Sequence, residues 1–219
     1  MTVKVKICGV RTPASLDAAA SAGADYVGLV FFAKSPRNLS LEDASRLADA
    51  ARGRVGTVAV LVDPDDILVD AVASTVRPDL LQLHGSETTA RVAEIKAHTS
   101  LPVIKAISVA EAADVASASA YAGIADQILF DAKALPDAVL PGGNGVAFDW
   151  SVLAAAQAPF ALSGGLNAGN VVEAVRLTGA ELVDVSSGVE TAPGVKDEKR
   201  IRQFIEAARS AAHQQAKAS

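Results

Sequence analysis

The sequence predicts a single-domain α/β protein built as a (β/α)8 TIM barrel. Eight short runs rich in Val, Ile and Leu alternate with Ala-rich helical segments along the 219 residues, as expected of parallel strands joined by helices. Half of the residues are hydrophobic but only 4% are aromatic, a composition that suits closely packed buried strands. The length fits one small barrel. A doubly wound open sheet also alternates strands and helices, but it usually has fewer parallel strands, so eight units favour closure.

Each expected strand is a short apolar run bounded by turn residues. The strands cover residues 3–8, 26–31, 55–62, 79–84, 102–107, 127–131, 159–163 and 182–186. The helices cover residues 13–22, 41–51, 64–76, 87–98, 110–120, 149–156, 168–178 and 197–212. Several helices begin with capping residues: Thr12 precedes Pro13, Ser40 precedes an acidic first turn, and Ser86 can cap the helix at 87–98.

Residues 1–212 are therefore expected to form the barrel domain. Residues 213–219 lack an apolar face and are expected to be a disordered tail. A net charge of −5 without a dense basic run argues against nucleic-acid binding. No apolar run approaches the ~18 residues that cross a bilayer, and the first strand does not resemble a signal peptide. We expect a cytoplasmic monomer without a membrane partner.

The sequence contains no motif for a metal or a cofactor. Its only cysteine, Cys8, excludes an intramolecular disulfide and a multi-cysteine metal site. The three histidines lack the spacing of metal ligands, and no G-x-G-x-x-G motif follows the first strand. We therefore expect chemistry that needs neither a metal nor a cofactor.

Reactive side chains stand at the carboxyl ends of the strands, where (β/α)8 barrels place their active sites. Cys8 ends the first strand, Arg37 follows the second, His84 ends the fourth and Asp131 ends the sixth. A thiolate and a carboxylic acid across the barrel mouth can act as general base and general acid, provided that the pKa of the thiol falls and that of the carboxyl group rises. Arg37 pairs either with a surface carboxylate or with a planar carboxylate of a ligand. His84 is either structural or a ligand contact.

Three glycine-rich turns follow the last three strands and predict a phosphate site. They contain Gly143 and Gly145, then Gly164 and Gly165, and then Ser186, Ser187 and Gly188. Glycine lets the backbone approach an anion closely, and the turn after the seventh strand leads at once to the expected helix, whose first N–H groups favour negative charge. The loops after strands 7 and 8 often bind phosphate in this fold. We expect a small phosphorylated ligand.

Lysines are expected inside the barrel. Lys4, Lys6 and Cys8 share one face of the first strand, and Lys105 lies on the fifth. A charge inside a barrel needs a partner, for which Asp184 on the eighth strand is a candidate as well as a candidate substrate contact. A structural ion-pair network is the simpler interpretation.

The motifs that contain these residues resemble the phosphoribosylanthranilate isomerase family. In order, they are KICG at 6–9, SPR at 35–37, LQLHG at 81–85, FD at 130–131, FDW at 148–150, LSGGL at 162–166, VDVSSGVE at 183–190 and PGVKD at 193–197. The resemblance extends to about Phe204. The combination is specific, although glycine turns alone recur in many phosphate-binding barrels.

The resemblance implies an Amadori rearrangement of N-(5-phosphoribosyl)anthranilate to the corresponding 1-deoxyribulose 5-phosphate in tryptophan biosynthesis. It implies that Asp131 protonates the ribose ring oxygen and that Cys8 removes the C2′ proton. It also implies that Arg37 faces the anthranilate carboxylate and that the three glycine turns hold the phosphate. Asn144 stands where the family usually has threonine. Because asparagine is polar and tolerates unusual backbone angles, phosphate binding is expected to survive.

Two other functions stay open. A related isomerase of histidine biosynthesis performs the same rearrangement on a two-phosphate substrate, but such enzymes have aspartate where Cys8 stands and a second phosphate site in the first half. Units 3 and 4 of this sequence contain no matching glycine turn. A catalytically silent phosphate-binding barrel would not need Cys8, Asp131 and Arg37 together.

Overall fold

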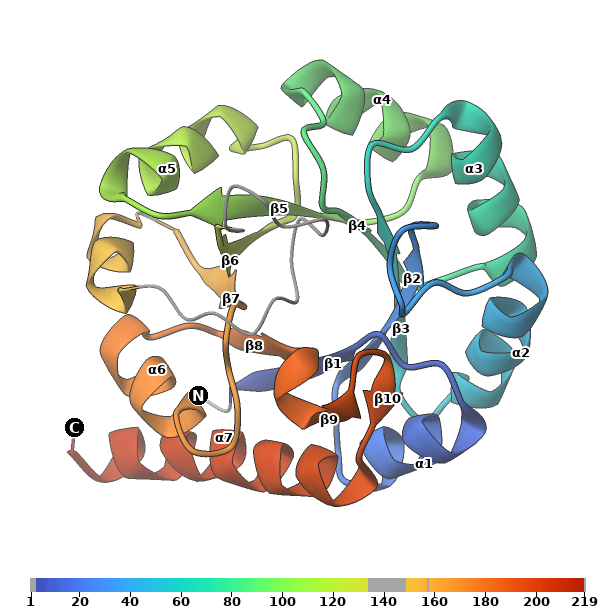
Figure 1. Cartoon of the computed structure of the whole chain (residues 1–219). Helices are drawn as coiled ribbons and strands as arrows, with labels where there is room; N and C mark the ends of the chain where they lie inside the picture. Colours follow the sequence, from blue (N-terminus) through green and yellow to red (C-terminus); the bar gives the residue numbers. More distant parts are fainter. Residues whose placement is uncertain (1–2, 134–148, 157, 219) are drawn as a thin grey trace.

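The computed structural model describes residues 3–133, 149–156 and 158–218, and these form a closed barrel of eight parallel strands. The strands pair in chain order, and β8 returns to pair with β1 (Figure 1). They are β1 (Lys4–Cys8), β2 (Tyr26–Phe31), β3 (Gly56–Leu61), β4 (Leu80–Leu83), β5 (Val103–Val109), β6 (Gln127–Ala132), β7 (Phe160–Leu162) and β8 (Leu182–Val185). The predicted (β/α)8 TIM barrel is confirmed.

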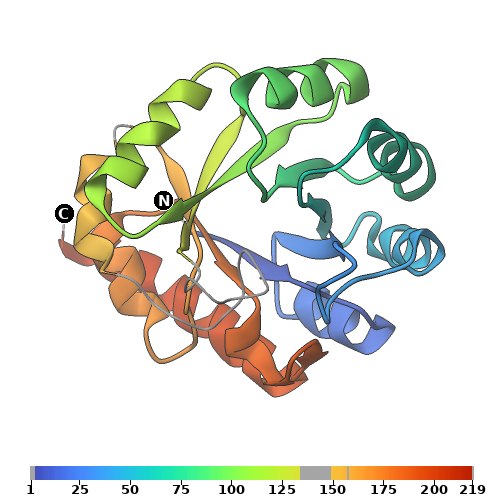
Figure 2. The same cartoon turned by 45° about the horizontal axis from the view of Figure 1, so that its top comes forward.

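Helices form a ring outside the strands (Figures 1 and 2). The α-helices are α1 (Pro13–Ser21), α2 (Leu41–Ala51), α3 (Asp66–Ala71), α4 (Thr89–Thr99), α5 (Ala112–Ser117), α6 (Val171–Thr178) and α7 (Glu198–Ala218). Single turns of other helix types are η1 (Val72–Val76), η2 (Ala118–Tyr121), η3 (Trp150–Ala155) and η4 (Ser187–Val189). A hairpin of β9 (Glu190–Ala192) and β10 (Val195–Lys196) follows η4.

The alternation of side chains along β1 shows how the core is divided. Val5 and Ile7 are buried between the strands and the helices, whereas Cys8 belongs to a second apolar cluster inside the barrel. Lys6 also points inside and is fully buried, as predicted. Lys4, expected on the same inner face, is exposed at the other end of the strand. The inside of the barrel is therefore a packed core.

Two predicted helices change helix type where a serine hydroxyl binds the helix backbone. The helix expected at 64–76 is α3 followed by the π-helical turn η1, and the helix expected at 110–120 is α5 followed by the 3-10 turn η2. The Ser74 hydroxyl donates to the carbonyl of Asp70 at 2.6 Å, and the Ser117 hydroxyl donates to that of Asp114 at 2.6 Å. Such bonds compete with the α-helical pattern.

The segment 149–156 forms only the 3-10 turn η3 in place of the expected α-helix. Asp149 caps it as a turn, because its carboxylate accepts from the backbone N–H of Ser151 at 2.9 Å. Trp150, Ser151 and Val152 are weak helix formers, so little favours continuation into a regular helix.

Several helix ends differ from the prediction. Thr12 and Ser40 cap their helices as expected, but α4 is capped by Thr88 and not by Ser86. As a consequence Glu87, expected to be the first helical residue, lies before the helix and is buried. At the other end of the chain, α7 continues to Ala218, past the expected end at residue 212. The disordered tail at 213–219 stays a prediction.

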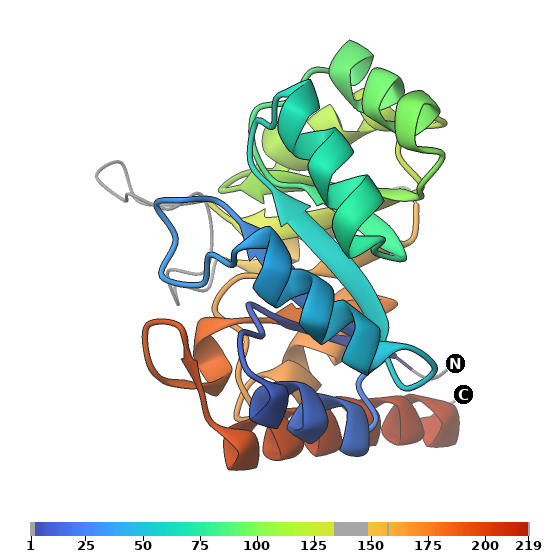
Figure 3. The ribbon, with the colours of Figure 1, turned by 90° about the vertical axis from the view of Figure 1, so that its right-hand side faces the viewer.

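The loops at the carboxyl ends of the strands share one side of the barrel. In the side view of Figure 3, the loop at 32–40 and the β9–β10 hairpin project together on the left. Near the opposite end, Arg209 of α7 donates to the backbone carbonyls of Val3 and Gly23. None of the helices in the described ranges is long and apolar enough to span a bilayer.

Candidate active site

One cavity lies among the loops at the carboxyl ends of the strands. Of the predicted site residues, it is lined by Cys8, Arg37, His84, Asp131, Gly164, Gly165, Asp184, Ser186 and Ser187. Residues that the sequence analysis did not assign to the site complete the lining: Val30, Phe32, Ser35, Val60, Val62, Ser163, Leu166 and Val185. The structure thus brings together the thiol, the carboxylates, the imidazole and the guanidinium.

Cys8 is the last residue of β1, and the residue is 9% exposed. A Cβ atom at Gly28 of β2 would lie 2.9 Å from Cys8 Sγ and 3.3 Å from Lys6 Nζ, so the thiol and the ammonium group meet beside this glycine. Burial raises the pKa of the Cys8 thiol above its ordinary value; Lys6 and Lys196 oppose the rise and Asp184 adds to it. The direction is therefore opposite to the fall in pKa that general-base catalysis was expected to require.

Lys6 and Asp184 form a buried ion pair between neighbouring strands. Lys6 Nζ donates to Asp184 Oδ2 at 2.8 Å, with side chains 0% and 4% exposed. Asp184 Oδ1 is buried and has no hydrogen-bond partner among the residues that the structure describes. Because Asp184 also lines the cavity, this oxygen can accept a hydrogen bond from a ligand.

Asp131 belongs to a chain of hydrogen bonds with His84 and Gln82. Its Oδ2 lies 3.1 Å from His84 Nε2, and its Oδ1 accepts from the N–H of Ala132 at 3.0 Å. Gln82 Nε2 lies 2.8 Å from His84 Nδ1. Because an amide nitrogen only donates, Nδ1 accepts and Nε2 carries the hydrogen that points at Asp131. In this arrangement the ring N–H of His84 and the backbone N–H of Ala132 both donate to Asp131.

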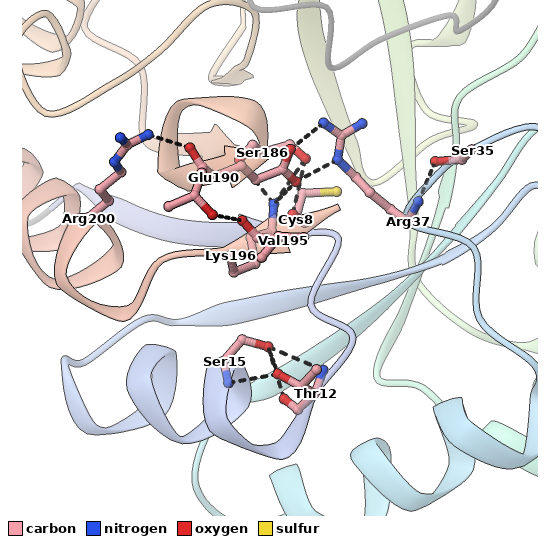
Figure 4. Close-up of polar contacts among 11 residues, drawn as sticks. Cys8, Thr12, Ser15, Ser35, Arg37, Ser186, Glu190, Val195, Lys196 and Arg200 are labelled. Carbon is pink, nitrogen blue, oxygen red and sulfur yellow. Dashed lines mark hydrogen bonds and ion pairs between the residues drawn. The ribbon is translucent and has the colours of Figure 1, made fainter. Parts of the chain in front are cut away.

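Arg37 is buried and binds a carboxylate of its own chain. Its Nε and Nη2 donate to the two carboxylate oxygens of Glu190, both at 2.8 Å (Figure 4). From the sequence, the expected partner of Arg37 was either a surface carboxylate or the carboxylate of a ligand. The observed partner is instead Glu190, a buried residue of β9. A role toward a ligand therefore rests on the position of Arg37 in the cavity lining.

Lys196 of β10 completes this cluster. Its ammonium group donates to Glu190 Oε1 at 2.8 Å and to the carbonyl of Ser186 at 3.0 Å, and the Ser186 hydroxyl donates to the carbonyl of Cys8 at 3.2 Å. Burial alone would raise the pKa of Glu190, but Arg37 and Lys196 more than offset it and lower the pKa to about 2. Burial lowers the pKa of Lys196, against the attraction of Glu190.

The sequence analysis assigned no role to Glu190 and Lys196, although both stand in motifs quoted for the family resemblance. Their spacing carries no periodic signal, because they lie on a short hairpin outside the barrel. With Arg37 and Lys196 against one carboxylate, the cluster retains one positive charge, which favours an anionic ligand.

The glycine turns are only partly where a phosphate site needs them. Gly164 has a φ of +90°, and a Cβ there would lie 2.5 Å from the nitrogen of Ala132, so only glycine fits beside the cavity. Gly165 also has a positive φ, +64°. Gly188 is outside the cavity lining and packs against the carbonyl of Leu166. Gly143 and Gly145 lie outside the described residues.

The turn after β7 does not lead at once into a helix. The side chain of Asn170 accepts from the N–H of Asn167 at 2.8 Å, and that of Asn167 accepts from the N–H of Gly169 at 2.8 Å. These bonds build a separate turn, so α6 begins at Val171. The helix expected from residue 168 therefore begins at Val171, and the use of its N-terminus for phosphate stays a prediction.

The same cavity offers no metal centre in the described part of the chain: no three His, Cys, Asp or Glu side chains are grouped to hold an ion. The side chains of Cys8 and Asp131 are instead suited to transfer protons. A thiol and a carboxyl group face one cavity, where both can exchange protons with a ligand.

Comparisons with known proteins identify the family of the chain. The family model of N-(5′-phosphoribosyl)anthranilate (PRA) isomerase matches residues 5–207. An N-(5′-phosphoribosyl)anthranilate isomerase of Rhodopseudomonas palustris (strain BisA53) is 56% identical over 212 residues, which cover 96% of this chain and 97% of the relative.

Solved structures are similar along the whole barrel. Monomers of the dimeric phosphoribosylanthranilate isomerase from Thermotoga maritima match with a TM-score of 0.81 and 36% identity, covering 95% of this chain and 99% of that chain. A phosphoribosylanthranilate isomerase in complex with reduced 1-(o-carboxyphenylamino)-1-deoxyribulose 5-phosphate matches with a TM-score of 0.82 and 35% identity, with the same coverage of 95% and 99%. The family model covers β1 from its second residue, all the other strands of the barrel and the β9–β10 hairpin. The chain therefore belongs to the N-(5′-phosphoribosyl)anthranilate isomerase family.

Proposed function

We propose that this protein catalyses the Amadori rearrangement of N-(5-phosphoribosyl)anthranilate to 1-(2-carboxyphenylamino)-1-deoxyribulose 5-phosphate, a step of tryptophan biosynthesis. The observation that carries the proposal is the presence of Cys8 and Asp131 in one cavity of a chain that belongs to this family. The rearrangement moves protons within one substrate without net oxidation, so two proton-transfer groups suffice.

Asp131 is the general acid of the first step. It donates a proton to the ribose ring oxygen, the bond from C1′ to that oxygen breaks, and the nitrogen lone pair forms the C1′=N iminium ion. The carboxylate that remains accepts hydrogen bonds from His84 and from the N–H of Ala132, which lowers the cost of the transfer.

Cys8 is the general base of the second step. Its thiolate removes the C2′ proton, and the electrons of that C–H bond form the C1′=C2′ double bond and neutralise the iminium nitrogen. The resulting enolamine loses its hydroxyl proton and gains one at C1′, which gives the ketone. Hydrogen atoms and electrons balance without a second reactant.

The charges around the cavity fit the two ends of this substrate. The positively charged cluster of Arg37, Lys196 and Glu190 suits the anthranilate carboxylate. The free oxygen of Asp184 suits a ribose hydroxyl. Backbone N–H groups at Gly164, Gly165, Ser186 and Ser187 are proposed to hold the phosphate, with Gly143, Gly145 and Gly188 as further predicted contacts.

The direct test follows freshly generated phosphoribosylanthranilate with purified protein and identifies the product by mass and by borohydride reduction. Conversion to the reducible ketone, after subtraction of spontaneous hydrolysis to anthranilate, is the expected result. Hydrolysis alone, in a sample shown by circular dichroism to be folded, would refute the proposal.

Variants assign the two roles. Cys8→Ala and Asp131→Asn are each expected to lower kcat by about 10²–10⁴-fold, the usual contribution of a general acid or base. Both variants should still bind the reduced product, since neither removes a phosphate contact, and calorimetric titration checks this. A variant that loses binding together with turnover would place that residue in substrate binding instead.

We propose that the protein is a monomer. Among the described residues the exposed large apolar side chains are Ile67, Leu177 and Val195, on α3, α6 and β10. Helices α3 and α6 stand on opposite sides of the ring, so Ile67 and Leu177 belong to no common patch (Figure 1). Light scattering should give the mass of one chain, 22.3 kDa. Twice that mass, as in the dimeric Thermotoga maritima relative, would refute the monomer.

We propose the cytoplasm as its location. The one cysteine is a free thiol in the active site, and a compartment that keeps thiols reduced preserves it. Cell fractionation with an antibody should find the protein with soluble cytoplasmic markers, and recovery with an oxidising compartment would contradict this.

A further inference from the structure

The side chains of Lys6 and Cys8 meet beside a position that has no side chain. Both point into the barrel from β1, and Gly28 of β2 pairs with Cys8 across the sheet. A Cβ atom at position 28 would be 2.9 Å from the sulfur and 3.3 Å from the Lys6 nitrogen. Only glycine leaves room for this contact between an ammonium group and a thiol.

Lys6 interacts with a carboxylate as well as with the thiol. It is fully buried, and Asp184 Oδ2 lies 2.8 Å from its ammonium nitrogen. Burial works to lower the pKa of Lys6, but Asp184 and Cys8 together raise it above its ordinary value, so it remains an ammonium ion. A cation held this close favours the thiolate form of Cys8 over the thiol.

We propose that Lys6 is a positioning residue for catalysis: it stabilises the Cys8 thiolate that removes the C2′ proton, and Asp184 limits how strongly it does so. The inference rests on the proposed function, in which Cys8 is the base. A purely structural ion pair would explain the burial of Lys6 and Asp184, but not why the missing side chain at Gly28 is replaced by both the Lys6 nitrogen and the Cys8 sulfur.

Other charged groups act on the same sulfur. Lys196 favours the thiolate from β10, and Asp184 disfavours it from β8. The remaining titratable or charged groups of the cavity lining are Arg37, His84 and Asp131. Lys6 differs from them because it shares β1 with Cys8 and is held rigidly from the neighbouring strand.

The test titrates the thiolate of Cys8 by its ultraviolet absorbance, with Cys8→Ser subtracted as background, in the full-length protein without substrate. Because the chain has one cysteine, the signal has one source. Lys6→Met is expected to raise the titration midpoint by about one pH unit or more. Lys6→Arg, which keeps the charge, is expected to restore most of the shift. Lys4→Met makes the same change at an exposed lysine of the same strand and should leave the midpoint unchanged.

A second comparison guards against misfolding. Lys6→Met leaves the buried carboxylate of Asp184 without its ion-pair partner, which can destabilise the fold. The double variant Lys6→Met/Asp184→Asn removes both charges, and its midpoint is expected to lie above that of Asp184→Asn alone by a similar amount. Asp184→Asn alone is expected to lower the midpoint relative to the parent chain.

Kinetics separate this inference from the proposed function. Since the base must be ionised, kcat/KM rises with pH, and Lys6→Met should move that rise to higher pH. An unchanged thiol midpoint in both comparisons, with isomerase activity intact, would overturn the role of Lys6 alone. A shifted midpoint in a protein without isomerase activity would confirm the electrostatic contact and refute the proposed function.

Discussion

Glu190 is the residue on which the charged side of the active site depends. One carboxylate binds Arg37 from the loop after β2 and Lys196 from β10 (Figure 4). Without it, two buried cations would lie beside each other with no common counter-charge. Arrangements of this kind lose much of their stability when the shared partner is removed, because buried charges remain unpaired.

We therefore expect Glu190→Gln to lower the stability of the protein in a pH-dependent way. The pKa of Glu190 is lowered from 4.5 to about 2, so its stabilising effect is complete above pH 4.5 and is lost as the pH falls toward 2. The variant is expected to be less stable than the parent by up to about 3 kcal/mol at pH 7, with the difference shrinking below pH 4.5. Denaturant unfolding across this pH range measures it.

A matched control is Glu173→Gln, which breaks an exposed pair with Arg176 on α6. Exposed pairs contribute little, so this variant should stay close to the parent at every pH. If the Glu190→Gln difference stayed constant between pH 7 and pH 3, the low pKa of Glu190 would be contradicted.

For single residues, the sequence predicted the site side chains that lie on barrel strands better than the ion-pair partners that lie in loops and hairpins. Cys8, His84 and Asp131 lie at or next to the carboxyl ends of β1, β4 and β6, so the strand alternation and the rule for barrel active sites placed them together. The partner of Lys6 followed from the same alternation. Glu190 lies 153 residues from Arg37 on a hairpin, and no periodicity predicts such a pairing.

Among the elements, the turn after β8 supports the turn after β7. Gly188 lies in η4, and a Cβ there would overlap with the Leu166 carbonyl oxygen and approach the Asn167 Cβ to 3.2 Å. Gly188 thus sets the distance between the two loops that are proposed to hold the phosphate. Its own contact with phosphate stays a prediction.

Gly188→Ala is expected to displace the loop after β7. Overpacking of this kind costs about 1–3 kcal/mol, and KM for the phosphorylated substrate should rise more than kcat falls. Gly123→Ala is the control, because Gly123 has a φ of +74° but no atom would lie within 4 Å of its Cβ. It should cost about 1 kcal/mol and leave KM unchanged. An unchanged KM in Gly188→Ala would refute the support role.

A second buried ion pair ties three further elements together. Glu87, before α4, accepts from Lys105 of β5 at 2.6 Å and from the backbone N–H groups of Asp63 and Gly85 at 2.9 and 3.0 Å. This carboxylate therefore fixes the loops after β3 and β4, next to His84.

Lys105→Met is expected to cost about 3–5 kcal/mol, because it leaves the buried Glu87 carboxylate without its cation. The double variant Lys105→Met/Glu87→Gln should recover part of this loss, since no buried charge remains. Chemical unfolding of both variants gives the comparison. A double variant as unstable as the single one would show that packing, and not charge, dominates here.

The bounds of the strands were predicted better than those of the helices. The predicted strand at 26–31 and helix at 41–51 agree with β2 and α2 to the residue, because each combines a clear apolar pattern with clear boundaries. The expected helices at 64–76 and 110–120 failed where serine hydroxyls bind the helix backbone, an effect that apolar periodicity does not record.

Over the whole molecule, the last helix completes the ring. Helix α7 lies along the outside between α6 and α1 (Figure 1) and buries Ile201, Phe204, Ile205, Ala208 and Ala211. Arg209 joins it to the start of the chain through the carbonyl of Val3 and, at 2.7 Å, the carboxylate of Asp25. The C-terminal helix thus packs next to the junction of β8 and β1 and contacts the N-terminal part of the chain.

Truncation tests where this domain ends. A chain that stops after residue 212 keeps every one of these buried residues of α7, so its unfolding free energy should stay within about 0.5 kcal/mol of the parent and its isomerase activity should be unchanged. A chain that stops after residue 203 loses Phe204 and Ile205, each worth about 1.5–3 kcal/mol, and exposes the junction of β1 and β8. Against a typical total of about 5–15 kcal/mol, that loss is expected to unfold the protein. Thermal unfolding by circular dichroism distinguishes the two chains.

A loss of unfolding free energy above about 1 kcal/mol in the chain that stops after residue 212 would contradict this boundary. It would mean that residues 213–219 add packing of their own, and the barrel domain would then extend beyond residue 212.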